Sequence, residues 1–241
     1  MMARMLRRLL SSGALLTALL AGGALLVAAV GVWLDLWTFR TGFTVLRYGA
    51  WVAVAAVVLS ALSLLVGPNR GRAVVALVIA ALAVWLPWSW QEQARSVPPI
   101  HDISTDLQDP PAFVAILPLR ADAPNPAAYA GPDTAAQQRQ AYPDLQTRHL
   151  ALPAAEAFTA VERAARDLGW TIVAAVPDEG RLEASDTTFW FRFTDDIVVR
   201  VRPEGSGSRL DVRSKSRVGR SDVGTNAARI RRFLSRLPQA P

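Results

Sequence analysis

The sequence contains no cysteine. Disulfides, thiolate nucleophiles and cysteine metal sites are therefore excluded, and the redox compartment stays open because a disulfide-free domain folds in either one. Histidine is almost as scarce: His101 and His149 are the two examples, far apart and without the spacing of zinc ligands. We therefore expect neither a bound metal nor a cofactor.

Acidic residues are nearly absent from the first 90 residues, where Asp35 is the only carboxylate among several arginines. This imbalance accounts for the formal net charge of +6, because the charges beyond residue 90 balance. The excess lies in segments that flank hydrophobic runs and not on a folded basic face. Nucleic acid is therefore not an expected partner.

Three long apolar runs, residues 13–34, 48–66 and 73–90, contain no charged side chain. Each is close to the roughly 20 residues that a helix rising about 1.5 Å per residue needs to cross a bilayer. The sequence therefore predicts a membrane domain over residues 13–90, after a basic tail at 1–12. Ion or proton transport is not expected, since such paths usually contain a charged side chain within the membrane.

Loop charges predict the orientation of these spans. Arg4, Arg7 and Arg8 precede the first span, and Arg70 and Arg72 lie between the second and third. Basic loops stay in the cytoplasm, so three crossings deliver the chain beyond residue 90 to the other side. We expect an integral protein of the inner (plasma) membrane, with a cytoplasmic N-terminus, a retained signal anchor and a periplasmic C-terminal domain.

Tryptophans give an independent indication of the same orientation, because this residue favours the membrane–water interface. Six lie at span ends that this topology places on the outer side: Trp33, Trp37, Trp51, Trp85, Trp88 and Trp90.

Small residues repeat every fourth position in the first span, at Ala14, Ala18 and Gly22. This spacing is typical of close helix packing in membranes. Packing within the three-helix bundle is the favoured interpretation, and homodimerisation through this face is the alternative.

The C-terminal part divides into two stretches. Residues 91–152 are rich in proline, which predicts extended chain packed on the soluble domain, with a short strand over 113–119 and a short helix capped by Asp133. Residues 153–241 have regular hydrophobic patterns and predict an α+β core.

Within that core, apolar residues at helical spacing predict one helix after Pro153, ended by Gly169, and a second from about Asp222 to Leu237. Alternating patterns predict strands between them. The expected strands cover residues 170–176, 181–185, 188–193, 197–202 and 209–216. Their short connections require an antiparallel sheet. The fold class is an N-terminal three-helix transmembrane bundle plus a C-terminal α+β domain, whose antiparallel sheet is covered on one face by two helices.

Alternation also predicts the register of the sheet. A loop over residues 194–196 aligns the phenylalanines of 188–193 with Ile197, while the next turn pairs Val201 with Leu210 and Val199 with Val212. One face of the sheet is then apolar and the other charged.

Three separated motifs are distinctive together: the stretch from Ile100 to Asp106, then Asp195-Asp196-Ile197, and finally Asp211 to Gly219 followed by Asp222, Gly224, Asn226 and Ala227. Over roughly residues 97–237 the sequence resembles the domain-of-unknown-function family 1499. The resemblance implies a soluble module that is often attached to membrane spans, and it implies no activity.

Two polar clusters are candidate sites. His101 and Asp102, with Asp195 and Asp196, are candidate acid–base or metal-binding groups of a small hydrolase. The alternative is that these side chains bond the backbone, with Asp195 and Asp196 at a hairpin tip.

The second cluster combines arginines at a strand end with a glycine-bearing loop and a helix N-terminus, which is a typical anion-binding arrangement. Its expected ligand-binding residues are Arg213, Ser214, Ser216, Arg217, Ser221, Asp222 and Asn226. The alternative is internal pairing, for example of Arg217 with Asp222.

No phosphate-binding loop, dinucleotide fingerprint or nucleophile elbow is present. The sequence therefore favours a membrane-anchored, extracytoplasmic binding module for an anionic envelope ligand, such as a lipid, or for a partner membrane protein. The hydrolase is one alternative, and an assembly factor or accessory subunit of a membrane complex is another. The lipid bilayer is the one partner that all of these functions share.

Overall fold

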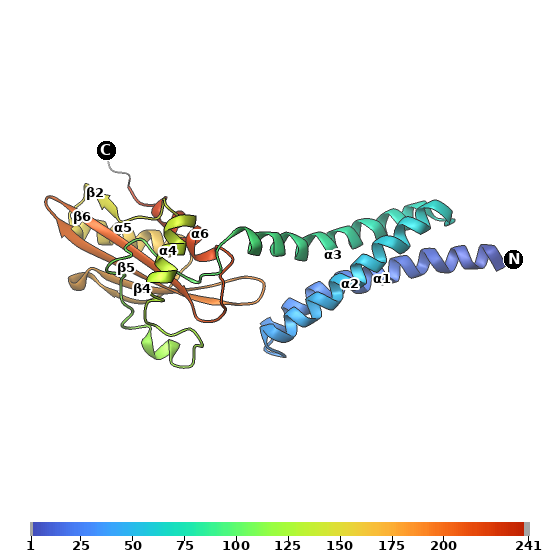
Figure 1. The fold of residues 1–241 in the computed structure, drawn as a ribbon, viewed down its shortest axis with the longest axis horizontal. Coiled ribbons are helices and arrows are strands. Elements are labelled where there is room, and N and C mark those ends of the chain that lie inside the picture. The colour runs from blue at the N-terminus through green and yellow to red at the C-terminus, as the bar shows by residue number, and fades with distance from the viewer. Residues whose placement is uncertain (1, 239–241) are drawn as a thin grey trace. The chain divides into compact units, whose positions relative to one another are not determined.

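The computed structural model describes residues 2–238. The chain forms two compact units: one comprises the N-terminal helices up to Gln93 together with Trp190–Arg192, and the other comprises the remaining residues from Ala94 onward. Figure 1 shows the order of the elements along the chain.

The first unit contains three long helices, α1 (Met2–Trp33), α2 (Phe39–Val66) and α3 (Arg70–Ser96). All three are long and apolar enough to cross a membrane, which confirms the prediction of three apolar helices. The helices extend beyond the apolar runs, and α3 continues for six polar or small residues past Trp90.

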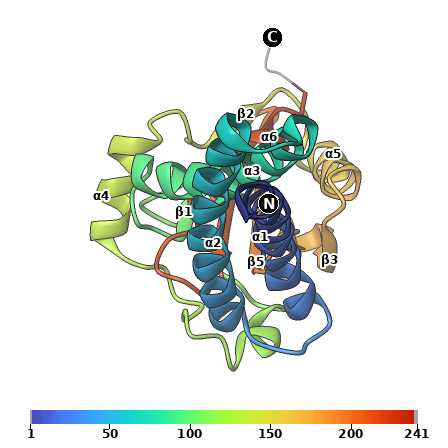
Figure 2. The same cartoon turned by 90° about the vertical axis from the view of Figure 1, so that its right-hand side faces the viewer.

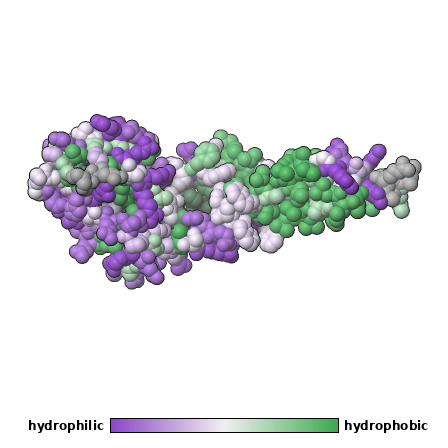
Figure 3. Space-filling model, turned by 90° about the horizontal axis from the view of Figure 1, so that it is seen from above, coloured by the Kyte–Doolittle hydropathy of each residue, from purple (hydrophilic) through white to green (hydrophobic). Residues whose placement is uncertain are grey.

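Small side chains hold the helices together. Ala14 and Ala18 of α1 are fully buried with Ala56 of α2 and Ala80 of α3, which lets the backbones approach closely. The small-residue face of α1 is therefore occupied inside the bundle, as the packing interpretation expects. Large apolar side chains point outward instead, as Figure 3 shows on the surface of the helices. Small side chains between the helices and large apolar side chains on their outer surface suit a lipid environment.

The second unit is built on one sheet with the strand order β1-β6-β5-β4-β3, in which β2 also pairs with β6. Every pairing is antiparallel, as the sequence predicted. The strands are β1 (Asp102–Ser104), β2 (Arg148–Leu150), β3 (Thr171–Val176), β4 (Arg181–Thr187), β5 (Thr194–Glu204) and β6 (Gly207–Ser216).

Two helices, α5 (Ala154–Asp167) and α6 (Thr225–Leu234), cover one face of the sheet. Their apolar stripes bury Phe158 and Phe233 against the inward side chains of β4, β5 and β6. The β5–β6 register is the predicted one, with Val201 opposite Leu210 and Val199 opposite Val212. The predicted α+β architecture is thus confirmed.

The other face of the sheet is covered by the proline-rich segment. This segment contains the 3-10 helix η1 (Leu117–Arg120) and α4 (Pro132–Ala141), and Figure 2 shows α4 and α5 on opposite sides of the unit. The strand expected at 113–119 is wrong, because the backbone there turns into η1 and bonds a side chain instead of a strand. The expected helix is present, but Gly131 and not Asp133 occupies its N-cap.

The connection between β4 and β5 also differs from the prediction. Residues 188–193 form the loop, and the residues expected to turn, Thr194 to Asp196, begin β5. The Thr188 N–H donates to the Phe193 carbonyl at 2.8 Å, and the Phe193 N–H donates to the Thr188 hydroxyl at 3.0 Å. These bonds close a tight tip in which Arg192 has a φ of 50°, in the left-handed region.

Candidate functional site

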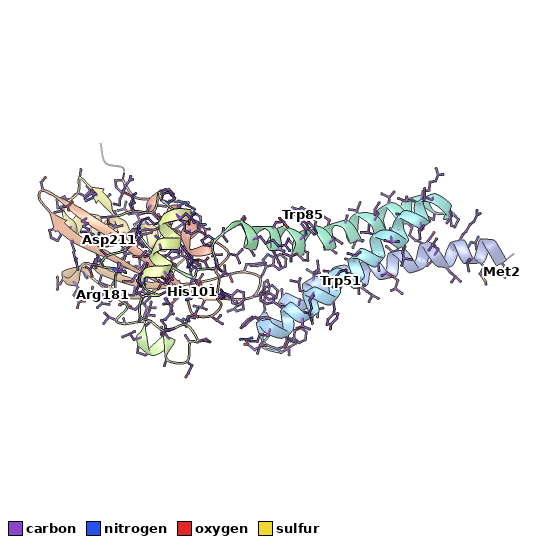
Figure 4. All side chains as sticks on the ribbon, in the orientation of Figure 1. Met2, Trp51, Trp85, His101, Arg181 and Asp211 are labelled. Atoms are coloured by element: carbon purple, nitrogen blue, oxygen red, sulfur yellow. The ribbon has the colours of Figure 1, made fainter. Side chains whose placement is uncertain are left out.

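Four of the candidate residues, Asp102, Asp196, Arg213 and Arg217, lie on the face of the sheet opposite α5 and α6. One row of paired positions crosses four strands, from β1 through β6 and β5 to β4: Asp102, Lys215, Asp196 and Ser185. Figure 4 labels His101, which precedes Asp102 in the chain, and Asp211 of β6. The charged face that the alternation predicted is therefore present, and the proline-rich segment encloses it.

Asp102 is the centre of one buried ion cluster. Arg213 approaches it with two nitrogens, Nε to Oδ1 at 2.8 Å and Nη2 to Oδ2 at 3.0 Å, while Lys215 Nζ lies 3.0 Å from Oδ2. All three residues are 2% exposed or less. Burial lowers the pKa of Lys215, although the Asp102 carboxylate opposes that shift. Such charges are stable in the interior only because each one is paired and hydrogen-bonded.

Asp196 is the centre of a second ion cluster on the same face. Its carboxylate accepts from Arg120 Nη1 at 2.6 Å, from Arg217 Nε at 2.9 Å and from the Ser185 hydroxyl at 2.7 Å. Arg217 therefore pairs with Asp196 and not with Asp222.

Asp195 belongs to the other face. It lies 2.7 Å from Arg229 of α6, and burial raises its pKa. Asp195 and Asp196 are thus strand residues, which corrects the expected hairpin tip, and they point to opposite sides of the sheet. This geometry keeps their carboxylates from acting as a pair.

His101 immediately precedes Asp102 in the chain, near the start of the second unit. Its Nδ1 is 3.2 Å from the carbonyl oxygen of Arg220, and burial lowers its pKa. Within residues 2–238, no group of three or more histidine or acidic side chains is placed to hold a metal ion.

The expected anion-binding residues mostly connect β6 to α6. The Ser214 hydroxyl donates to Asn226 Oδ1 at 2.6 Å, and Asn226 Nδ2 donates to the Ser216 hydroxyl at 3.0 Å. These three residues and Arg213 are buried, whereas Arg217 and Ser221 are partly exposed.

Asp222 ends the connection to α6. Its two carboxylate oxygens accept from the N–H groups of Gly224 at 2.8 Å and Asn226 at 2.9 Å, while the Ser221 hydroxyl accepts from the Val223 N–H at 3.2 Å. The carboxylate thus satisfies the free N–H groups at the start of the helix, where an anion would otherwise bind. Burial raises the pKa of Asp222 to about 6.

A feature that the sequence analysis missed is centred on Glu183 of β4. Its fully buried carboxylate accepts from the backbone N–H groups of Val114, Ala115 and Ile116 at distances of 2.9–3.1 Å, and it pairs with Arg181. No spacing signal could have revealed this contact, because Glu183 resembles any polar residue of an alternating strand and its partners are about 70 positions away.

Glu183 fixes the path of residues 114–119, which we call the 114–119 loop. Phe113 and Ile116 point inward and are 5% and 0% exposed. The outward side chains are large and apolar: Val114, Leu117 and Leu119 are 51%, 45% and 53% exposed. A rigid scaffold therefore presents three apolar side chains to solvent.

Residues 102–237 match the family model described as protein of unknown function (DUF1499). The chain belongs to this family. The DUF1499 region begins with β1 and ends three residues after α6, so it comprises the sheet, its covering helices and the proline-rich segment from residue 102 onward. The resemblance drawn from the three sequence motifs is thereby confirmed. No curated protein and no solved structure matches the chain.

Proposed function

We propose that this protein is a membrane-anchored binding module whose DUF1499 domain lies on the extracytoplasmic side and binds a partner membrane protein through the 114–119 loop. The observation that carries the proposal is the exposure of Val114, Leu117 and Leu119 on a loop whose backbone is held by Glu183. Exposed apolar groups within six residues of one another are typical of protein contact surfaces.

The rigidity of the loop supports binding. Arg120, which follows the loop, is 4% exposed and ion-paired with Asp196, and Glu183 holds the other end. A surface that is already ordered loses little conformational entropy when a partner docks, so more of the contact energy appears as affinity.

The contacts of the charged residues favour this surface over the alternatives. An anionic ligand at Arg213 and Arg217 would have to displace Asp102 and Asp196 from those donors. Asn226 is buried and bonds Ser214 and Ser216 instead. A hydrolase using Asp195 and Asp196 would need two carboxylates that the sheet separates. Binding to a membrane neighbour is also the property expected of an accessory subunit or assembly factor.

The extracytoplasmic side is supported by the basic N-terminal tail and by Arg70 and Arg72 between α2 and α3. Both segments lie on the same side of three spans, and basic segments remain cytoplasmic. An odd number of spans then places the DUF1499 domain opposite them.

Photo-crosslinking in native membranes tests the partner surface. A photoreactive residue at Leu117 or Leu119 is expected to give the same adduct from both positions, and one at Thr159, exposed on α5, is expected to give none. The double variant Leu117→Glu with Leu119→Glu should no longer copurify with the crosslinked partner, while its circular dichroism spectrum stays unchanged. Equal adducts from Leu117 and Thr159, or copurification that survives the double variant, would refute this proposal.

A further inference from the structure

The tip of the β4–β5 hairpin has the composition of a membrane-interface element. Residues 189–192 read Phe-Trp-Phe-Arg, and Phe189 is 67% exposed. Aromatic side chains favour the boundary between lipid headgroups and acyl chains, and arginine adds attraction to anionic lipids. Trp190–Arg192 also group with the apolar helices and not with the sheet that carries the hairpin.

The register of the sheet shows toward which end this tip points. Asp102, the first residue of β1, lies in one row with Ser185 of β4 and Asp196 of β5. The strands β4 and β5 continue from this row toward the tip, and the chain that precedes Asp102 leaves the row at the same end. The aromatic tip and the connection to the membrane helix therefore share one end of the domain.

The connection is short. Five residues separate the end of α3 at Ser96 from Asp102, which limits their span to about 20 Å. A hydrogen bond of 2.8 Å from the Ile100 N–H to the Pro98 carbonyl folds this linker, so it is shorter than that limit. From Ser185 to Phe189 the hairpin extends roughly 10 Å beyond the row, at the same end of the domain as the linker.

We infer that the tip of the β4–β5 hairpin, residues 189–192, inserts into the headgroup region of the bilayer that holds α1 to α3. Phe189, with part of Trp190, supplies apolar surface at the acyl boundary, and Arg192 reaches the lipid phosphates, while Phe191 is 6% exposed and packs against Phe43. The DUF1499 domain then touches its membrane at two points, the covalent linker and this tip, and these two points restrict its rotation about the linker.

The absence of cysteine allows a direct test on the full chain. A single nitroxide label is introduced by Phe189→Cys, with the matched control Ser206→Cys at the tip of the β5–β6 hairpin. Both residues are exposed, and the 11 residues of β5 separate the two tips by about 35 Å. The labelled proteins are reconstituted in phosphatidylcholine–phosphatidylglycerol nanodiscs.

Collisions of the label with oxygen, which concentrates in lipid, and with a water-soluble nickel chelate report its surroundings. We expect oxygen collisions to exceed nickel collisions at position 189, and the opposite at position 206. A third label from Thr187→Cys, two residues below the tip, should report a shallower depth than position 189. Equal nickel access at 189 and 206 would overturn the inference, as would low collisions with both reagents at 189, which indicate packing against protein.

Discussion

Replacing Glu183, whose carboxylate holds the 114–119 loop, should loosen that loop. In Glu183→Gln one carboxylate oxygen becomes an NH2 group, which donates and does not accept. Either oxygen faces at least two N–H groups of residues 114–116, so the substitution sets donors against donors whichever way the amide turns. The loop should therefore open more often.

The magnitude follows from the bonds that are lost. A hydrogen bond to a charged group contributes about 1.5–3 kcal/mol, and a buried N–H left without an acceptor costs a similar amount. Opening of the loop should become easier by about 2–3 kcal/mol, which corresponds to roughly 30- to 150-fold faster amide exchange at residues 114–116.

Hydrogen–deuterium exchange of the full chain in detergent measures this change in a peptide that covers the loop. Glu179→Gln is the matched control, because Glu179 also bonds Arg181, at 2.9 Å, but its side chain is 59% exposed. An exposed pair contributes little, so exchange in the control should stay within about threefold of the wild type. Unchanged exchange in Glu183→Gln, or an equal increase in both variants, would show that the carboxylate does not hold the loop.

Three further outcomes are expected. Arg229→Ala should destabilise the DUF1499 domain by about 3–5 kcal/mol in urea unfolding, because it leaves Asp195 buried without its cation. The control Arg232→Ala removes an exposed arginine and should change the stability little. Similar losses in both variants would contradict the pairing of Arg229 with Asp195 as a source of stability. The pKa of Asp222 is raised from 3.8 to about 6, so the folded state binds this proton more tightly, and stability should fall by up to about 3 kcal/mol as pH rises from about 4 to 6. Asp222→Asn should flatten that part of the stability curve, and an unaltered curve would exclude Asp222 as its cause. Alkaline phosphatase fused after Pro241 should be active and β-galactosidase at the same position inactive; the reverse pattern would place the domain in the cytoplasm.

Features that depend on local pattern could be predicted from the sequence. The three apolar helices follow from runs without charge, and the β5–β6 register follows from Val199 and Val201 opposite Val212 and Leu210. The helices α5 and α6 follow from apolar residues at helical spacing. In each case the spacing of apolar residues along the chain and the need to bury them predict the same element.

The error at the β4–β5 loop has a definite physical origin. Phenylalanine and tryptophan favour strands, and adjacent aspartates favour turns, so local preference assigned residues 188–193 to a strand and Asp195-Asp196 to a loop. The structure reverses both assignments. Arg229 and Arg120, distant in sequence, compensate the buried carboxylates and let the strand run through them.

The candidate site was partly predictable for a related reason. The charged residues on one face follow from alternation, but their pairing follows from the fold of the whole chain. Asp102 and Arg213 are separated by more than 100 positions, as are Asp106 and Arg209. No local spacing could distinguish such internal pairs from donors that await a ligand.

The opposite directions of Asp195 and Asp196 have a consequence for how the sheet is aligned. A displacement of β5 by a single residue would carry Asp196 beneath α6 and Ile197 among the arginines, leaving charges without counter-ions at a cost of several kcal/mol. The shifted strand could form the same backbone hydrogen bonds, but its unpaired side-chain charges would make this register unstable. Deleting one residue between 194 and 204 should therefore be far more damaging to the domain than replacing one, because the adjacent acids specify the alignment of its 11-residue strand.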